Sequence, residues 1–463
     1  MLLNSLNFIF AFLPVVLILY YVVPAKWKNI VLTVFSIYFY AWGEPIYVVL
    51  MLISTVLHFM MAIDIERKQK RGDAGKSTLV FVIVTDVFIL SFFKYFGVLS
   101  EAVNSIFGTG FSPEALSLPI GLSFYTFRNL SYIIDVYKKK HPAEKNFFAF
   151  TAYASLFATM AAGPIVRYDD IKENLYDHQV YMSKMGEGVQ RFIIGLSKKV
   201  LLADQLALIG SQIQDIGGNM SVLTAWIYLF SYTMQIYFDF SGYSDMAIGI
   251  GKMLGFDFKE NFNYPYIAKN VTDFWRRWHI SLSGWFRDYV YIPLGGNRAG
   301  TGTHIRNILI VWCLTGIWHG STGNFFVWGL YYAVILILEK YVWKEHLKKL
   351  PAWAANVYTM VLVMIGWTIF MNPSFDKGMS MIGSLFGFGA TNVIDVTAGY
   401  YFKTEILLFV ICIMAARPFL KKVMDKITER SSVVAVVLYG VLFCLCIAGL
   451  VFNSYQPFLY MQF

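Results

Sequence analysis

Apolar stretches of about the length needed to cross a lipid bilayer recur along the whole chain, and this recurrence constrains the fold more than any other feature. Twelve runs stand out: 8–23, 29–43, 46–63, 77–98, 116–136, 147–163, 221–240, 305–319, 323–342, 356–370, 405–416 and 432–452. About 20 apolar residues in a helix span the hydrocarbon core. The stretches 188–212, 241–256 and 376–399 are short or interrupted by Gly, Ser and Asp. We expect re-entrant segments there, since irregular backbone at membrane depth needs protein or water around it.

Composition agrees with a membrane protein. Of the 463 residues, 57% are hydrophobic and 14% are charged, and the mean hydropathy is +0.55. A soluble domain carries roughly 25% charged residues. The start of the chain lacks a basic segment and a small-residue cleavage site, so its first apolar run is interpreted as a retained span. The sequence therefore predicts an all-α polytopic integral membrane protein with about a dozen crossing or partly crossing helices, folded as one domain over 1–463.

Basic residues in the short connections predict the orientation. The connections 25–29, 66–76 and 138–145 hold eleven Lys and Arg, whereas the alternating ones (the N-terminal tail, 43–45 and 99–115) hold none. Such a bias marks the cytoplasmic side, so we expect the N-terminus outside and the chain in the cytoplasmic membrane. The net charge of +9 then reflects topology. A nucleic-acid partner is disfavoured because the basic residues are dispersed rather than gathered on one face.

The segment 274–298, FWRRWHISLSGWFRDYVYIPLGGNR, does not resemble a span. Wound as one helix over 275–290, it gathers its aromatic residues on one face, with His279 among them, and its arginines on the rest. This pattern is typical of a helix in the interface or beside a cavity. The arginines then contact either lipid headgroups or a phosphorylated donor such as coenzyme A. The following PLGGNR (293–298) predicts a tight turn.

A second histidine, His319, lies in LTGIWHGSTGNFFVWG (314–329) within apolar surroundings. An ionisable side chain at membrane depth is costly and is by default a functional candidate. The alternative is a buried histidine with one hydrogen-bond partner, and this alternative applies to His279 as well. Asp239 and Asp245, six residues apart in 237–249, point to opposite sides of a helix. A shared carboxylate dyad is therefore not expected. One of the two is expected to orient an imidazole or to pair with an arginine, and structural pairing is the preferred interpretation. The four cysteines show neither a disulfide framework nor a metal-site spacing.

Several long motifs resemble the membrane-bound O-acyltransferase superfamily. They are LPIGLSFYTFRNLSYIIDVY (118–137), AGPI (162–165), YFDFSGYSDMAIG (237–249), the segment 274–298, WHG (318–320) and SYQPFLYMQF (454–463). They occur in the family's order from residue 118 to the end, with 1–117 as N-terminal spans. The PLGGNR turn and the YMQF ending favour the branch with the membrane subunit of alginate O-acetylation. The WRRWHISLS core is shared with the D-alanyl transferases of teichoic acid.

The resemblance implies a ring of helices around a thinned centre, where a donor from the cytoplasm meets an acceptor from outside. It also implies that catalysis depends on the histidine of the WHG motif, here His319, with a second important histidine in the RWH motif, here His279. A neutral imidazole in a poorly hydrated site suits removal of a hydroxyl proton. The oxyanion donors remain open among His279, Asn324 and backbone N–H groups of WHGSTGN. Further candidates for binding substrate or donor are Arg276, Arg277, Trp278, Trp318, Asn324 and Asp239.

The function predicted first is transfer of an acetyl group across the membrane for O-acetylation of an exopolysaccharide or cell-wall glycan. The donor is expected to be acetyl-CoA or an acyl-carrier thioester, with no resident cofactor or metal. The resemblance implies a separate extracytoplasmic acetyltransferase of SGNH type as partner. Two alternatives remain: D-alanyl transfer to teichoic acid, and a non-enzymatic polysaccharide export subunit. Transporters usually show two related halves, and the sequence has no such repeat.

Overall fold

The computed structural model describes residues 1–110, 116, 118–216, 220–298, 300–452 and 458–459, and this part of the chain is helical and contains no strand. The all-α prediction is confirmed. The described residues form two compact units: 1–192 with 243–259, and 193–242 with 260–463. The prediction of one integral domain stays a prediction. Most of the last motif, 454–463, lies outside the described residues.

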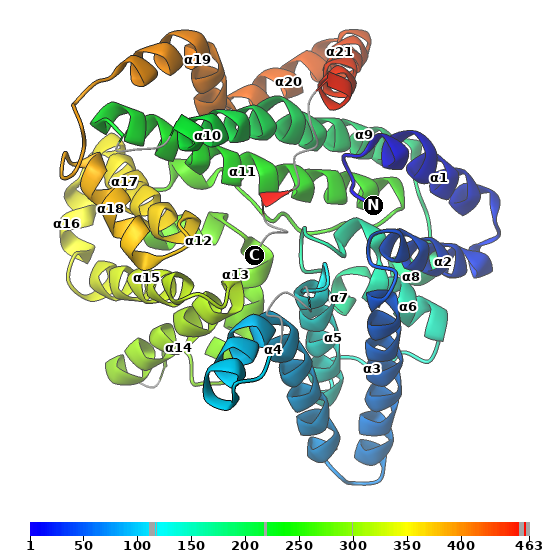
Figure 1. Cartoon of the computed structure of the whole chain (residues 1–463). Helices are drawn as coiled ribbons and strands as arrows, with labels where there is room; N and C mark the ends of the chain where they lie inside the picture. The colour runs from blue at the N-terminus through cyan, green and yellow to red at the C-terminus, as the bar shows by residue number, and fades with distance from the viewer. Residues whose placement is uncertain (111–115, 117, 217–219, 299, 453–457, 460–463) are drawn as a thin grey trace. The chain divides into compact units, whose positions relative to one another are not determined.

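The first unit contains the N-terminal helices (Figure 1). Its helices are α1 (Leu13–Val22, preceded by a π-helical turn Phe8–Phe12), α2 (Ala25–Gly43), α3 (Tyr47–Lys70), α4 (Lys76–Phe107), α5 (Leu122–Tyr137), α6 (Phe147–Ser155), α7 (Tyr168–Ile171), α8 (Asn174–Asp177) and most of α9 (Met182–Ser197). Glycines at left-handed φ, Gly75 (+72°) and Gly108 (+64°), flank α4, a backbone conformation that glycine adopts at least cost.

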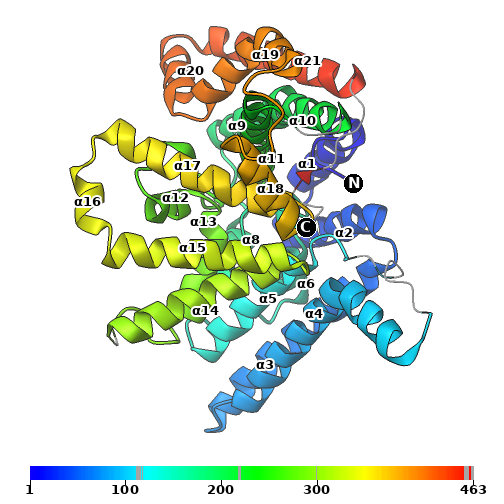
Figure 2. The ribbon, with the colours of Figure 1, turned by 60° about the vertical axis from the view of Figure 1, so that its left-hand side comes forward.

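Helices α3, α4 and α5 lie side by side in both views (Figures 1 and 2). Between α3 and α4 the His58 Nε2 and Asp86 Oδ2 atoms are 2.9 Å apart, both residues being buried. On α5 the guanidinium of Arg128, 1% exposed, donates to the carbonyls of Tyr153, Ala154 and Thr159. Arg128 therefore satisfies the carbonyls that become free where α6 ends.

The second unit contains the remaining helices (Figure 2). They are α10 (Asp204–Ile216, after a π-helical turn Lys198–Ala203), the first part of α11 (Val222–Met253), α12 (Val271–Arg277), α13 (Ile280–Phe286, followed by a π-helical turn Arg287–Tyr291), α14 (Thr301–His319), α15 (Gly323–Tyr341), α16 (Lys344–Lys349), α17 (Ala352–Met371), α18 (Phe375–Leu385), α19 (Val396–Ala415), α20 (Phe419–Arg430) and α21 (Ser432–Phe452). Two short 3₁₀ turns, Phe157–Thr159 in the first unit and Pro265–Ile267 here, complete the described helical segments.

Helices α14 and α15 form a hairpin whose backbones approach closely. A Cβ atom on Gly316 would lie 2.5 Å from the carbonyl oxygen of Phe325, and one on Gly329 would meet the carbonyl oxygen of Trp312. Small residues permit this approach between membrane helices. The adjoining PLGGNR turn is held against α14, because the Asn307 side-chain amide donates to the carbonyls of Leu294 and Gly296. The predicted turn is confirmed.

The predicted apolar runs coincide with helices in the described residues. Five helices, α3, α4, α17, α19 and α21, are long and apolar enough to cross a membrane, and 8–22 and 147–159 are shorter apolar helical segments. The stretch 376–399 is interrupted, since α18 ends at Leu385 and α19 begins at Val396, whereas 241–256 is not interrupted before Met253. The expectation of re-entrant segments stays a prediction. Helix α11 continues to Met253 because its small residues, such as Gly249, permit close packing against α9.

Candidate active site

Both candidate histidines line one cavity in the second unit. The cavity has a volume of about 1050 Å³ and is bounded by residues of α12 to α17. His279 is 3% exposed and His319 is 8% exposed. The two residues are 40 positions apart in the sequence and come from different helices, so the fold has brought them to one space large enough for a substrate.

The helix predicted over 275–290 is wrong, because the chain breaks at His279. Helix α12 ends at Arg277, and α13 begins at Ile280. His279 has a left-handed backbone, with φ of +44°, which costs a non-glycine residue roughly 1–2 kcal/mol. The backbone carbonyl of Asn261 accepts from the Ile280 N–H at 2.9 Å. This contact stabilises the break between α12 and α13.

Asn261 also determines which nitrogen of His279 carries the proton. The Ser281 backbone N–H donates to Asn261 Oδ1 at 3.1 Å, and this identifies that atom as the amide oxygen. His279 Nδ1 lies 3.2 Å from the same oxygen, so Nδ1 must donate. In the neutral ring Nε2 is then a proton acceptor. The Asn261 side chain is fully buried, so water does not compete with His279 Nδ1–H for the amide oxygen.

His319 is the last residue of α14 and lies among aromatic rings. Its ring centroid is 4.9 Å from that of Trp328, 4.7 Å from that of Trp318 and 5.2 Å from that of Phe370. These neighbours come from α14, α15 and α17. These rings enclose the imidazole, which is only 8% exposed.

The predicted binding residues divide into two groups. Arg276 and Trp278 line the cavity together with His279, whereas Arg277, Trp318, Asn324 and Asp239 are not among the described lining residues. Arg277 instead forms an ion pair with Asp273, with 2.9 Å between Nε and Oδ1. The Asn324 amide donates to the carbonyls of Ile369 and Asn372, and so its N–H groups tie α15 to the end of α17.

Asp239 takes part in a buried ion pair outside the cavity. Lys199 Nζ lies 2.6 Å from Asp239 Oδ1 and 2.8 Å from Asp204 Oδ1. Asp239 Oδ2 accepts from the backbone N–H of Leu459 at 2.7 Å. In the first unit, Asp245 pairs with Arg191 at 2.7 Å. The two carboxylates thus pair with different basic groups, and the expectation that they form no shared dyad is confirmed.

Sequence reasoning missed Glu339, which lines the cavity, and Asn261, which contacts His279. Glu339, 5% exposed, accepts from the backbone N–H groups of Val271 and Thr272 at 2.7 and 2.9 Å, which stabilises the start of α12. Glu339 could have been found from the sequence, because an acidic residue near the end of the apolar run 323–342 is a functional candidate. Asn261 carries no comparable signal, because its role depends on the distant segment 279–281.

The lining of the cavity is predominantly cationic. Six Lys and Arg side chains line it against two carboxylates, those of Asp273 and Glu339, and the cationic ones are Lys269, Arg276, Arg287, Lys340, Lys344 and Lys348. His304 adds a ring whose Nδ1 lies 2.7 Å from the Tyr341 hydroxyl and 3.2 Å from Lys340 Nζ. Such a lining attracts anionic ligands, phosphate groups in particular.

Comparisons with known proteins identify the family of the chain. Residues 137–375 match the model of the membrane-bound O-acyltransferase family. The chain is similar to the probable alginate O-acetylases AlgI of Pseudomonas putida, at 35% identity over the whole of both chains, and of Pseudomonas aeruginosa, at 40% identity over 84% of this chain and 75% of the relative. It is also similar to the peptidoglycan O-acetyltransferase of Helicobacter pylori, at 31% identity over 85% and 81%. Both histidines lie inside the matched segment.

Proposed function

The chain belongs to the membrane-bound O-acyltransferase family, and from that premise we propose that it moves an acetyl group across the membrane for O-acetylation of a polysaccharide or cell-wall glycan. It is a multi-pass membrane O-acyltransferase. The named substrates of its relatives, alginate and peptidoglycan, are glycans. The observation that carries the proposal for the site is the single cavity lined by His279 and His319.

In the proposed reaction an acceptor hydroxyl attacks the carbonyl carbon of an acetyl thioester. His319 removes the hydroxyl proton as the new C–O bond forms, and the carbonyl oxygen becomes an oxyanion. Collapse of this intermediate breaks the C–S bond, and the leaving thiolate takes the proton from the imidazolium. No covalent acetyl-enzyme is needed, and the proton that enters with the alcohol leaves with the thiol.

His279 is assigned the role of a hydrogen-bond acceptor that positions the acceptor substrate through a donor group other than the reacting hydroxyl, whose single proton passes to His319. The His279 Nδ1–H is engaged by Asn261, so the neutral ring offers a lone pair at Nε2 rather than an N–H group. This argues against neutral His279 as an oxyanion donor. The Asn324 N–H groups are engaged elsewhere. Of the donors considered, the backbone N–H groups of the WHGSTGN turn remain, and the oxyanion is assigned to them.

The donor is proposed to be acetyl-CoA or an acyl-carrier thioester. Both bring phosphate groups several bonds away from the thioester, and the six cationic side chains of the cavity are suited to bind them. These cations support the entry of a large, anionic donor into a site bounded by apolar helices. No resident cofactor or metal takes part in this reaction scheme.

The acceptor is proposed to be a hydroxyl of an extracytoplasmic partner of SGNH type, which then acetylates the glycan. The bias of basic residues in the short connections supports a cytoplasmic membrane location with the N-terminus outside. On this arrangement the thioester approaches from the cytoplasm and the hydroxyl from the opposite side. Supporting a separate partner, the described helices are joined by short connections that offer no large domain for gripping a polymer.

The first experiment is transfer of label from radioactive acetyl-CoA to the extracytoplasmic partner, with both proteins purified. We expect His319→Ala to lower the transfer rate by at least about 10³-fold, the range lost with a general base. His279→Ala is expected to lower it less. The matched control is His346→Ala, which removes an exposed histidine of α16 outside the cavity.

Three outcomes would contradict the proposal. Wild-type transfer that persists in a folded His319→Ala protein would remove the base from the scheme. Transfer of D-alanine from a carrier thioester, with acetyl-CoA inert, would assign the chain to teichoic acid D-alanylation. Export of the glycan that depends on the chain, without any acyl transfer, would instead identify a transport subunit.

A further inference from the structure

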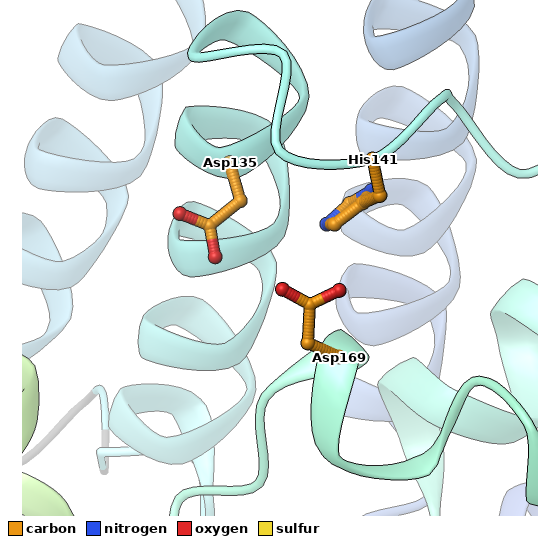
Figure 3. A group of neighbouring side chains, drawn as sticks. All are labelled: Asp135, His141 and Asp169. Atoms are coloured by element: carbon orange, nitrogen blue, oxygen red, sulfur yellow. The ribbon is translucent and has the colours of Figure 1, made fainter.

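A second cluster of chemically reactive side chains lies in the first unit. Asp135 from the end of α5, His141 from the following loop and Asp169 from α7 point toward one another (Figure 3). One potential ligand atom from each side chain lies within 4.8 Å of the other two. All three residues are outside the catalytic cavity and have no part in the reaction described above.

The geometry of His141 is that of a metal-binding histidine. Its Nδ1 lies 3.1 Å from the carbonyl oxygen of Pro142. A carbonyl only accepts, so Nδ1 carries the proton and Nε2 has the lone pair. This arrangement, with one nitrogen held by a backbone carbonyl, orients histidine ligands in metal proteins. His141 is 6% exposed, and its Nε2 has no hydrogen-bond partner among the described residues.

Neighbouring rings hold the imidazole in place. The His141 ring stacks on Tyr132, with 5.5 Å between centroids, and lies 4.9 Å from the ring of Tyr168. A buried nitrogen acceptor without a donor costs free energy. The cost is explained if an electrophile occupies the space between His141 and the two carboxylates, toward which Figure 3 shows the ring directed.

Each carboxylate of the cluster forms an ion pair with a lysine whose side chain is exposed to solvent. Lys140 Nζ lies 2.6 Å from Asp135 Oδ1, and Lys172 Nζ lies 3.0 Å from Asp169 Oδ1. The side chains of Lys140 and Lys172 are 43% and 38% exposed, so both ammonium groups can swing into water. A divalent cation would replace them at the cluster without leaving either lysine buried and unpaired.

We infer that Asp135, His141 and Asp169 form a binding site for a divalent transition-metal ion, with Zn²⁺ as the best match. Imidazole with carboxylates favours zinc and its neighbours over Mg²⁺ and Ca²⁺, which prefer oxygen ligands alone. Some point lies no more than about 2.8 Å from all three atoms, and closure by less than 1 Å each reaches the roughly 2.1 Å of zinc bonds. Water completes the coordination. The ion joins α5, the 138–146 loop and α7.

The test is a titration of the full-length, tag-free protein in detergent with Zn²⁺, in competition with a chromophoric chelator. We expect one tightly bound equivalent and a Tm that rises on binding. Asp169→Asn and His141→Gln are expected to weaken zinc binding by about 100-fold or more. Two matched controls are expected to leave it unchanged: Asp170→Asn, whose carboxylate contacts Lys259, and His346→Gln.

Two further measurements separate a metal site from a plain ion-pair network. Lys140→Ala is expected to strengthen zinc binding severalfold, because it removes the competing ammonium. Mg²⁺ is expected to bind at least tenfold more weakly than Zn²⁺. The inference is overturned if the wild-type protein binds no zinc, if Asp169→Asn binds it as tightly as wild type, or if Mg²⁺ competes equally. Because Asp169 is partly exposed, we expect Asp169→Asn to fold. Its zinc affinity therefore tests the proposed site even if His141→Gln does not fold.

Discussion

The proton position on His279 is determined by a backbone amide two residues away. Ser281 N–H identifies Asn261 Oδ1 as the acceptor, and that oxygen then requires a proton on His279 Nδ1. A single asparagine thus sets both the orientation and the protonation of a candidate catalytic ring. In the proposed mechanism Asn261 is a positioning residue, because it acts on the reaction only through His279.

Removing Asn261 is expected to lower kcat and leave KM for the donor unchanged. In Asn261→Ala the ring loses its orienting acceptor and can adopt the other tautomer, so we expect kcat to fall about 10- to 100-fold. Asn261→Asp keeps an acceptor oxygen and is expected to restore part of the rate. Steady-state kinetics with acetyl-CoA measures both parameters. The exposed Asn263→Ala serves as control. A rise in KM with kcat unchanged would show that Asn261 has no role in chemistry.

The lysines at the cavity are expected to control donor affinity. Reversing Lys344 and Lys348 to Glu should raise KM for acetyl-CoA roughly tenfold at low salt, since each reversal replaces attraction for phosphate by repulsion. The difference should shrink in high salt as charges are screened. Lys421→Glu with Lys422→Glu on α20 makes the same change in net charge away from the cavity. Equal effects of the two pairs would contradict a local donor site.

His178 is expected to make folding stability depend on pH. It lies in the loop after α8, where burial, helped by nearby Lys28, lowers its pKa from 6.5 to about 4. Its Nδ1 lies 3.1 Å from the Tyr20 hydroxyl, which donates to the carbonyl of Leu254. Below about pH 6.5 the His178 imidazole of the unfolded chain therefore binds a proton. In the folded chain the same imidazole stays unprotonated until the pH falls to about 4.

The contribution of His178 to stability is complete above pH 6.5 and is lost as the pH falls toward 4. Thermal unfolding of wild type and His178→Gln across this window measures it. The Gln variant does not titrate, so its Tm should fall less steeply. Parallel Tm curves for the two proteins would show that His178 is not buried in neutral form.

Among the elements, the α14–α15 hairpin is the one that positions His319. His319 ends α14, and the chain returns after three residues as α15. The backbones meet at Gly316 and Gly329, so a change at the contact is transmitted to the turn that carries the histidine.

Gly316→Ala is expected to lower stability by about 1–3 kcal/mol, the usual cost of overpacking, and to reduce acyl transfer by displacing His319. Detergent unfolding monitored by intrinsic tryptophan fluorescence measures the stability. Gly302→Ala, in the same helix with open space around it, should be neutral or slightly stabilising. If both variants behave alike, the close approach has no structural importance.

The elements of this chain were predictable to different degrees. Apolar runs predict the helices, because membrane crossing needs a continuous apolar length that local sequence records. The break at His279 was not predictable from spacing, since it depends on hydrogen bonds from Asn261, 18 residues earlier. The same holds for the cluster of Asp135, His141 and Asp169, whose members belong to three segments. The aromatic surroundings of His319 were predictable, because its motif supplies some of the rings.

At the scale of the whole molecule, the distribution of basic residues predicts which loops face the cytoplasm. In a cysteine-free background, Thr109→Cys should react with a membrane-impermeant thiol reagent in intact cells. Ala74→Cys, in a basic loop, should react only after the membrane is permeabilised. Labelling of Ala74→Cys from outside would reverse the orientation, and with it the proposed direction of acetyl transfer.

The glycine contact between α14 and α15 also has an evolutionary consequence. Neither Gly316 nor Gly329 has space for one added methyl group, so selection is expected to act against substitution at both positions and to keep the placement of His319. The exposed lysines at the cavity meet no such barrier. On the proposed function, a change of acyl donor is therefore expected to arise from changes of charge at these lysines, while the histidines and the helices that carry them stay as they are.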